Sequence, residues 1–230
     1  MNIAPPQVLY TKNADPNHKE VSMLHHHTEV SLGFTDEKEP VGTHMCLVYT
    51  EDEERVDSLL KFLLSGLQGG ERTACFSDKL TEETIREYLL KNHISYDERK
   101  AEKAITITGT SDVYFQNGVF DPDRMLNTLI TYYKEAQELG FPASRLIGEM
   151  TPEIQQVPGG ERLLEYESRV SILLRDHPVT TVCQYNANLF DGATILEVLK
   201  VHPKMIINGT VITNPFYIEP EAYLKGHITR

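Results

Sequence analysis

The sequence lacks features that mark several large classes of protein. It holds only three cysteines in 230 residues, Cys46, Cys75 and Cys183, and no two of them form a C-x-x-C pair. This odd, sparse count within apolar runs indicates reduced thiols in the cytoplasm. No apolar run reaches the roughly 18–20 residues that span a bilayer, and the first 17 residues show no apolar core of a secretion signal. We therefore expect a cytoplasmic protein without a membrane partner.

Positive charge is also scarce. The chain has 22 Lys and Arg against 34 Asp and Glu, which gives a formal net charge of -12. A protein that binds a phosphate backbone needs clustered Lys and Arg to release counterions. The charge balance therefore predicts no direct binding of nucleic acid.

The segment after the first apolar run lacks a phosphate-binding loop. A P-loop NTPase carries G-x-x-x-x-G-K-[ST] here, whose backbone N–H groups and Lys hold phosphates. Residues 49–55 read YTEDEER, with no glycine and no lysine. The acids from Glu51 to Glu54 already complement the positive end of the helix that follows, and they would repel a triphosphate. Thr50 and Glu53 are expected to form the capping box of this helix, and Gly69-Gly70 is expected to end it.

What is present is an alternation of strand and helix patterns. Short apolar runs typical of buried strands cover residues 44–49, 73–76, 104–108, 145–148 and 179–183. Apolar residues at helical spacing lie between and after them, at 56–67, 81–91, 121–140, 160–175 and 194–201. Asp121 is expected to cap the third of these helices, with Pro122 in its first turn. Five alternations predict a three-layer α/β fold with a mostly parallel sheet and helices on both faces.

The two ends of the chain differ from this pattern. Residues 1–41 show no sustained period and are expected to form an irregular arm with at most one short element, its His25-His26-His27 run being a mobile surface tract. Residues 42–230 are expected to form the α/β domain. A C-terminal β-hairpin at about 205–213 closes it, because Asn208-Gly209 supports a type I′ turn.

The carboxyl ends of parallel strands are the usual place for ligands. Tyr49, Glu149 and Tyr185 fall at this rim. Glu149 either binds a polar group of a ligand, or is solvated or pairs with a nearby Arg. The two tyrosines either line a partly apolar pocket or pack beneath the loops. Glu167 continues the buried face of its helix and is expected to form a structural ion pair there.

His44, Cys46 and Cys183 form a second candidate group. His44 and Cys46 face the same side of one strand, and Cys183 lies on another central strand. Thiolate and imidazole together suit zinc, and the thiols also suit a redox site. The alternative is that the cysteines are small core residues and that His44 is hydrogen-bonded at the start of its strand. A closed zinc site needs about four ligands, so we assign no metal and no other cofactor.

Several motifs occur in a characteristic order. They are Gly42-Thr43-His44-Met45-Cys46-Leu47-Val48-Tyr49, the run from Gly118 to Leu126, Gly148-Glu149-Met150, Leu164-Glu165-Tyr166-Glu167, Cys183-Gln184-Tyr185 with Phe190, and His202-Pro203. Together they resemble the MEDS family, the methanogen/methylotroph, DcmR-type sensory domains, over about residues 41–214.

The resemblance implies a RecA/KaiC-like fold without the P-loop and a sensory role in signal transduction. A non-catalytic domain of this kind would bind a small organic ligand and signal through a protein partner such as a histidine kinase or a transcriptional regulator. No output domain can be recognised in the chain, so signalling would use a partner protein or a homo-oligomer. The ligand-binding residues expected on this basis are His44, Cys46, Tyr49, Glu149, Cys183 and Tyr185. A degenerate nucleotide-binding ATPase relative and a ligand-free interaction scaffold are the alternatives.

Overall fold

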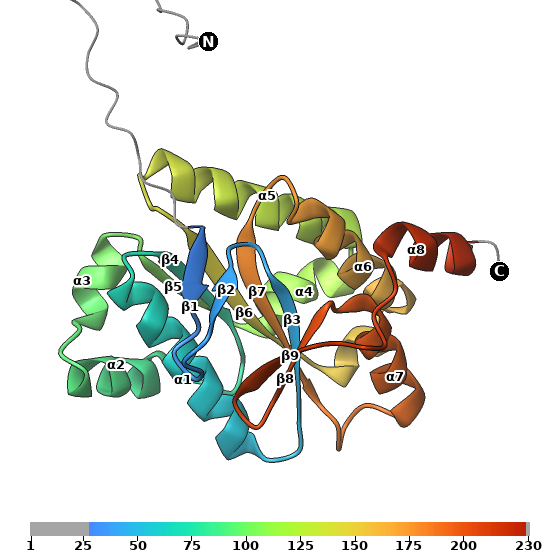
Figure 1. Ribbon diagram of the computed structural model, residues 1–230, viewed down its shortest axis with the longest axis horizontal. Coiled ribbons are helices and arrows are strands. Elements are labelled where there is room, and N and C mark those ends of the chain that lie inside the picture. The colour runs from blue at the N-terminus through green and yellow to red at the C-terminus, as the bar shows by residue number, and fades with distance from the viewer. Residues whose placement is uncertain (1–27, 229–230) are drawn as a thin grey trace, which may run out of the picture.

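The structure is a computed structural model that describes residues 28–228. A seven-stranded sheet lies at its centre, with α1 and α2 over one face and α5 and α6 over the other (Figure 1). The strand order is β5-β4-β6-β7-β3-β8-β9. Every neighbouring pair is parallel except the last, β8 and β9. The predicted three-layer α/β fold with a mostly parallel sheet is confirmed.

The strands of this sheet follow the predicted apolar runs and extend several of them. They are β3 (His44–Tyr49), β4 (Arg72–Phe76), β5 (Ile105–Thr108), β6 (Ser144–Met150), β7 (Val179–Asn186), β8 (Lys204–Ile207) and β9 (Thr210–Thr213). β6 and β7 are buried along almost their whole length because helices cover both faces, which is why neither strand alternates regularly between apolar and polar residues.

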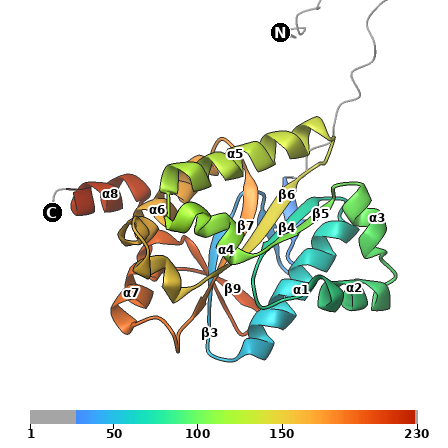
Figure 2. The same ribbon diagram turned by 180° about the vertical axis from the view of Figure 1, so that it is seen from behind.

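Five helices were predicted and are present: α1 (Asp52–Gln68), α2 (Glu82–Lys91), α5 (Pro122–Glu138), α6 (Leu163–Leu173) and α7 (Gly192–Val201). Shorter helices were not predicted, namely α3 (Tyr96–Ala101), α4 (Thr110–Tyr114), α8 (Pro220–Ile228) and the 3-10 turns at Gln116–Gly118 and Pro152–Gln156. The helix predicted at 160–175 begins with a 3-10 turn at Gly160–Arg162 that leads into α6. Seen from behind, α5 and α4 lie together over the sheet (Figure 2). None of the helices in residues 28–228 is long and apolar enough to cross a bilayer.

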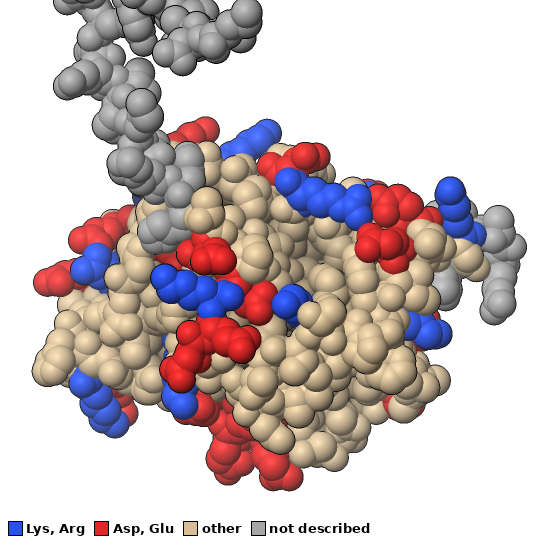
Figure 3. Space-filling model, in the orientation of Figure 1, with Lys and Arg blue, Asp and Glu red and all other residues tan. Residues whose placement is uncertain are grey.

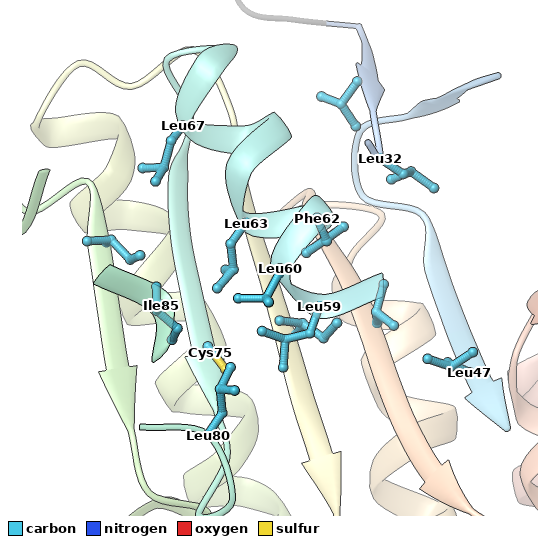
Figure 4. Packing of buried hydrophobic residues seen from close by; sticks show 14 of the residues in the cluster. Leu32, Leu47, Leu59, Leu60, Phe62, Leu63, Leu67, Cys75, Leu80 and Ile85 are labelled. Atoms are coloured by element: carbon cyan, nitrogen blue, oxygen red, sulfur yellow. The ribbon is translucent and has the colours of Figure 1, made fainter. Parts of the chain in front are cut away.

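The two faces of the sheet have separate apolar cores. Leu59, Leu63 and Ile85 of α1 and α2 pack on Leu47 and Cys75 of the sheet (Figure 4). On the opposite face, apolar side chains of α5, α6 and α7 form the second core with the alternate residues of the same strands. Consecutive strand residues therefore belong to different cores.

The start of α1 differs from its prediction. Glu51 is the N-cap residue, and no side chain accepts a hydrogen bond there, so the predicted capping box of Thr50 and Glu53 is wrong. Thr50 lies one position before the cap, and its carbonyl accepts a hydrogen bond from Asn188 instead. The acids of the first turn complement the helix dipole. Gly69 ends the helix as predicted.

Two other local predictions are confirmed. The carboxylate of Asp121 accepts hydrogen bonds from the backbone N–H groups of Asp123 (3.0 Å) and Arg124 (3.3 Å), with Pro122 in the first turn. Asn208 and Gly209 both have positive φ, 48° and 73°, as a type I′ turn requires. These sites fix the start of α5 and the register of the closing hairpin.

The end of the predicted arm is ordered into two strands. β1 (Glu29–Ser31) and β2 (Lys38–Pro40) form an antiparallel pair, although the prediction for residues 1–41 allowed at most one short element. Val30 and Leu32 are buried in the same core as α1, and the Ser65 hydroxyl donates to the carbonyl of Ser31 (2.8 Å). Three-residue strands are too short to show a period in the sequence. The His25-His26-His27 tract lies outside the described residues.

Candidate functional site

The strand register divides the six predicted site residues into two groups. Cys46 pairs with Cys183, and Val48 pairs with Tyr185, so these residues face the same side of the sheet. The residues that face α6 and α7 are His44, Cys46, Cys183 and Tyr185. Tyr49 and Glu149 point to the opposite face, towards α1, because their positions alternate with those of the first group. The structure therefore does not bring Tyr49 and Tyr185 into one pocket.

Glu149 is the centre of a buried polar network beneath α1. Its Oε1 lies 2.5 Å from Nζ of Lys79, and its Oε2 accepts a hydrogen bond from the Ser77 hydroxyl (3.0 Å). Nη1 of Arg55 lies 3.6 Å from the same Oε2, and the Tyr49 hydroxyl donates to Oε1 (3.4 Å). We call Glu149, Arg55, Lys79, Ser77 and Tyr49 the glutamate network. Its central acid is 2% exposed and paired with cations, so it is not a solvated strand-end residue.

The glutamate network occupies the end of β3 and the start of α1, where a P-loop would hold phosphates. Arg55 also donates to the carboxylate of Asp52, from Nε at 2.7 Å. Burial and the Glu149 carboxylate raise the pKa of the Tyr49 hydroxyl, which therefore stays protonated. Acidic side chains gather over the start of α1 on the molecular surface (Figure 3). Both cations of this region are thus matched by carboxylates of the chain itself.

A second polar cluster lies on the opposite face of the sheet. His44 of β3, Glu167 of α6, Cys183 of β7 and His202 after α7 each place one ligand atom within 4.8 Å of the others, and all four residues are buried. We call these four residues the histidine cluster. Oε2 of Glu167 lies 3.3 Å from Nε2 of His44 and 3.5 Å from Nε2 of His202. Sγ of Cys183 lies 3.5 Å from both Nε2 of His44 and Oε2 of Glu167.

Hydrogen bonds around the histidine cluster orient its side chains. Nδ1 of His202 lies 2.8 Å from the carbonyl of Val198, so Nδ1 carries the proton. Nδ1 of His44 lies 2.9 Å from the hydroxyl of Ser171. These contacts leave Nε2 of each ring directed towards Glu167. The Tyr185 hydroxyl donates to the other carboxylate oxygen, Oε1, at 2.5 Å.

The burial of the histidine cluster sets its protonation. Burial, together with the neighbouring His202, lowers the pKa of His44 to about 4, so the ring is neutral near pH 7. Burial opposes the ionisation of Glu167, but the imidazoles of His202 and His44 outweigh it and hold its pKa well below the ordinary value. Burial and the Glu167 carboxylate raise the pKa of the Cys183 thiol. The Glu167 carboxylate therefore lies next to two imidazoles and one thiol in a buried site.

The histidine cluster differs from the group that the sequence suggested. Cys46 does not belong to it, because its Sγ contacts the carbonyl of Lys204 at 3.8 Å. Glu167 does pair inward, as predicted, with imidazoles as its partners. His202 was not considered as a functional residue. The His202-Pro203 motif was the signal, but it gives no indication of which residues lie close to it in the fold.

A groove lies on the same face as the histidine cluster, between α5 and the edge of the sheet. Its volume is about 460 Å³. Apolar and polar side chains alternate along its walls, among them Phe76, Thr108, Asn127, Thr131, Tyr132 and Leu146. This mixture is typical of sites for small, partly apolar ligands.

The family of the chain can now be stated. The model of the MEthanogen/methylotroph, DcmR Sensory domain matches residues 43–203. The chain belongs to the MEDS family. The histidine cluster, the glutamate network and all the residues named on the groove walls lie within the matched span. The curated proteins include none that matches the sequence.

Solved structures share the fold of this MEDS domain. The flagellar accessory protein FlaH of Methanocaldococcus jannaschii is 11% identical, with a TM-score of 0.59, over 80% of this chain and 84% of that one. A protein of Pyrococcus horikoshii in complex with an unknown peptide is 15% identical, with a TM-score of 0.52, over 73% and 77%. A KaiC-like protein of Pyrococcus horikoshii is 15% identical, with a TM-score of 0.49, over 72% and 70%. The first two of these structures show that the fold of this chain is shared with FlaH and with the peptide-bound protein.

Proposed function

We propose that this MEDS domain is a non-catalytic sensory module that binds a small, partly apolar organic molecule and signals through a partner protein. The observation that carries this proposal is the glutamate network. Where a RecA-like ATPase holds phosphates, this chain places Arg55 and Lys79 against Glu149 and acids in the first turn of α1. The fold is retained while the phosphate site is filled by charges of the chain itself.

The alternative, a degenerate nucleotide-binding ATPase, conflicts with the charges at this position. A triphosphate would have to displace the Glu149 carboxylate from Lys79 and approach Asp52 and Glu53. Displacing Lys79 is costly because the Glu149 carboxylate is buried, at 2% exposure, and would lose its shortest cation contact. The cations that would hold phosphates are already engaged, which favours the non-catalytic function.

The groove beside α5 is the place we propose for the ligand. The six residues expected from the sequence to bind it are all at most 3% exposed, so a ligand would have to open the packed interior to touch them. Thr131 and Asn127 are exposed on the groove wall, while Leu146 and Phe76 give it an apolar floor. This arrangement accepts an organic molecule with one polar group and an apolar body.

The route from ligand to partner follows from the position of α5. This helix forms one wall of the groove and packs on α6, and its outer side chains are exposed. A ligand that shifts α5 against the sheet changes the surface offered to a protein partner, such as a histidine kinase, a transcriptional regulator or a second copy of the chain. Binding shifts this equilibrium only as far as the two states differ in affinity for the ligand.

The test compares two kinds of ligand on three proteins. The wild type, Thr131→Trp and Lys134→Trp would be screened by thermal shift and ligand-detected NMR with Mg-ATP, Mg-ADP and a panel of benzyl alcohol, phenol and butanol. Thr131→Trp fills the groove, whereas Lys134 is exposed on α5 but does not line the groove, so its variant is the matched control. We expect an alcohol to bind the wild type and Lys134→Trp but not Thr131→Trp. Stabilisation by a nucleotide, or alcohol binding that Thr131→Trp leaves intact, would overturn the proposal.

A further inference from the structure

We infer that the histidine cluster binds one divalent transition-metal ion, with Zn²⁺ the ion that fits its donors best. The ligands would be Nε2 of His44, Nε2 of His202, Sγ of Cys183 and Oε2 of Glu167. This inference does not rest on the proposed function, because the groove and the histidine cluster are different places in the fold.

The spacing of the donor atoms is the first argument. Tetrahedral zinc with bonds of about 2.0 Å to nitrogen or oxygen and about 2.3 Å to sulfur separates two N or O ligands by roughly 3.3 Å, and sulfur from either by roughly 3.5 Å. The carboxylate oxygen Oε2 lies 3.3 Å and 3.5 Å from the two Nε2 atoms. Sγ lies 3.5 Å from Nε2 of His44 and 3.5 Å from Oε2. Four of the six edges of the tetrahedron therefore have the lengths that zinc requires.

The second argument is a polar atom without a partner. His202 is 0% exposed, so no solvent reaches its Nε2 atom, and no hydrogen bond satisfies that atom. Because Nδ1 of His202 contacts the carbonyl of Val198, Nε2 is the nitrogen left to bind an ion, and it faces Oε2 of Glu167 at 3.5 Å. Neutral imidazole nitrogen is the commonest metal ligand in proteins.

The third argument is the charge and chemistry of the donors. A thiolate at Cys183 and a carboxylate at Glu167 carry two negative charges, which a divalent ion neutralises in a site that excludes water. Imidazole nitrogen and thiolate sulfur select zinc, cobalt or similar ions, whereas magnesium and calcium prefer oxygen ligands. Two nitrogens, one sulfur and one oxygen therefore point to Zn²⁺ rather than to an alkaline-earth ion.

The residues around the cluster support this assignment. Tyr185 binds the free carboxylate oxygen of Glu167, Ser171 contacts Nδ1 of His44, and Val198 accepts from Nδ1 of His202. Hydrogen bonds of this kind, made to the ligand side chains themselves, orient metal ligands and fix the tautomer of each histidine. Four protein ligands leave no open coordination position, as in structural zinc sites. The ion would join two central strands to α6 and to the end of α7.

Co²⁺ is the probe for the test, because the absorption spectrum of the bound ion reports both the coordination geometry and the presence of a sulfur ligand. The full chain would be unfolded with chelator, refolded with excess Co²⁺ and freed of unbound ion, since the buried site is best loaded during folding. Cys183→Ser removes the proposed sulfur ligand. Cys46→Ser is the matched control, because Cys46 is the register partner of Cys183 on the same face and is equally buried, but lies outside the cluster.

We expect wild type and Cys46→Ser to bind about one equivalent of cobalt and to show intense visible bands with a thiolate-to-cobalt charge-transfer band. Cys183→Ser should lose the charge-transfer band. Elemental analysis of wild type refolded with Zn²⁺ gives a second measurement that needs no variant. Metal far below one equivalent in correctly folded wild type, or a charge-transfer band that survives in Cys183→Ser and disappears in Cys46→Ser, would overturn the inference.

Discussion

Sγ of Cys183 and Nε2 of His44 lie 3.5 Å apart, although 139 positions separate the two residues in the chain. The parallel pairing of β3 with β7 brings them together, since His44 is in register with Thr181 and residues two apart share a face. Glu167 and His202 reach the same point from α6 and from the end of α7. The histidine cluster thus depends on the arrangement of the whole sheet, which makes it sensitive to substitutions in its surroundings.

Removing the hydroxyl of Tyr185 is expected to weaken metal binding without abolishing it. Tyr185→Phe deletes the hydrogen bond to Oε1 of Glu167, and loss of such a contact typically lowers metal affinity about 10- to 100-fold. Competition with a chelator would measure the affinity, while the cobalt spectrum should keep its tetrahedral form. Tyr132→Phe is the control, because Tyr132 donates to the carbonyl of Arg145, away from the cluster. Equal effects of both substitutions would contradict a role of Tyr185 in positioning Glu167.

The stability of the metal-free protein is expected to fall between pH 7 and pH 5. Burial lowers the pKa of His44 from 6.5 to about 4, so the folded state binds fewer protons than the unfolded state in this window. Stability therefore increases with pH here, and acidification from 7 to 5 costs about 2 kcal/mol from this residue. Glu167, whose folded-state pKa is depressed, loses its contribution only below its ordinary value of 4.5.

Urea unfolding at several pH values, with chelator present, checks this prediction. His44→Gln removes the titrating ring and should flatten the dependence of the free energy of unfolding between pH 7 and pH 5. Retention of the full slope in His44→Gln would show that other groups cause it. The imidazole of His202 and the carboxylate of Glu167 face the same point, so their variants would be measured next.

The sequence predicted the architecture because the fold repeats strong local signals. Apolar runs, helical spacing and caps such as Asp121 with Pro122 each act over a few residues, and the helices and strands they predicted are present. β1 and β2 were missed because three residues carry too little pattern, and the buried Val30 and Leu32 join a core formed by residues distant in the sequence.

The sites were harder to predict because they depend on the strand register and on distant partners. Each candidate group contained one misplaced strand residue, Cys46 in the one and Tyr185 in the other. The partners Arg55 and Lys79 of Glu149 were not identified, and neither was His202. Tyr49 and Tyr185 both lie at strand ends, yet they face opposite sides of the sheet. Alternation along one strand is visible in a sequence, whereas the register between two strands is not.

Adding one methyl group to α1 at Gly66 is expected to destabilise the fold. A Cβ at Gly66 would lie 2.6 Å from Cγ2 of Thr73 and 2.7 Å from the side chain of Arg145, which forms a buried ion pair with Glu71. Overpacking of this kind costs about 1–3 kcal/mol. At Gly192, in the first turn of α7, a Cβ meets no atom within 4 Å. Gly192→Ala should therefore be neutral or slightly stabilising, and urea unfolding of both variants decides whether close packing at Gly66 matters.

Replacing Arg55 is expected to destabilise the domain through the charge that it leaves behind. Arg55→Met removes one cation beside the Glu149 carboxylate, and breaking a buried pair in this way costs about 3 kcal/mol or more. Lys61→Met on the same helix breaks only an exposed pair with Asp57 and should cost at most about 1 kcal/mol. The double variant Arg55→Met with Glu149→Gln should recover part of the loss, because the buried carboxylate is gone and the charges that remain, Lys79 and Asp52, are exposed to solvent. If the double variant is less stable than Arg55→Met by the full effect of Glu149→Gln alone, the two residues do not interact and the glutamate network is not a unit.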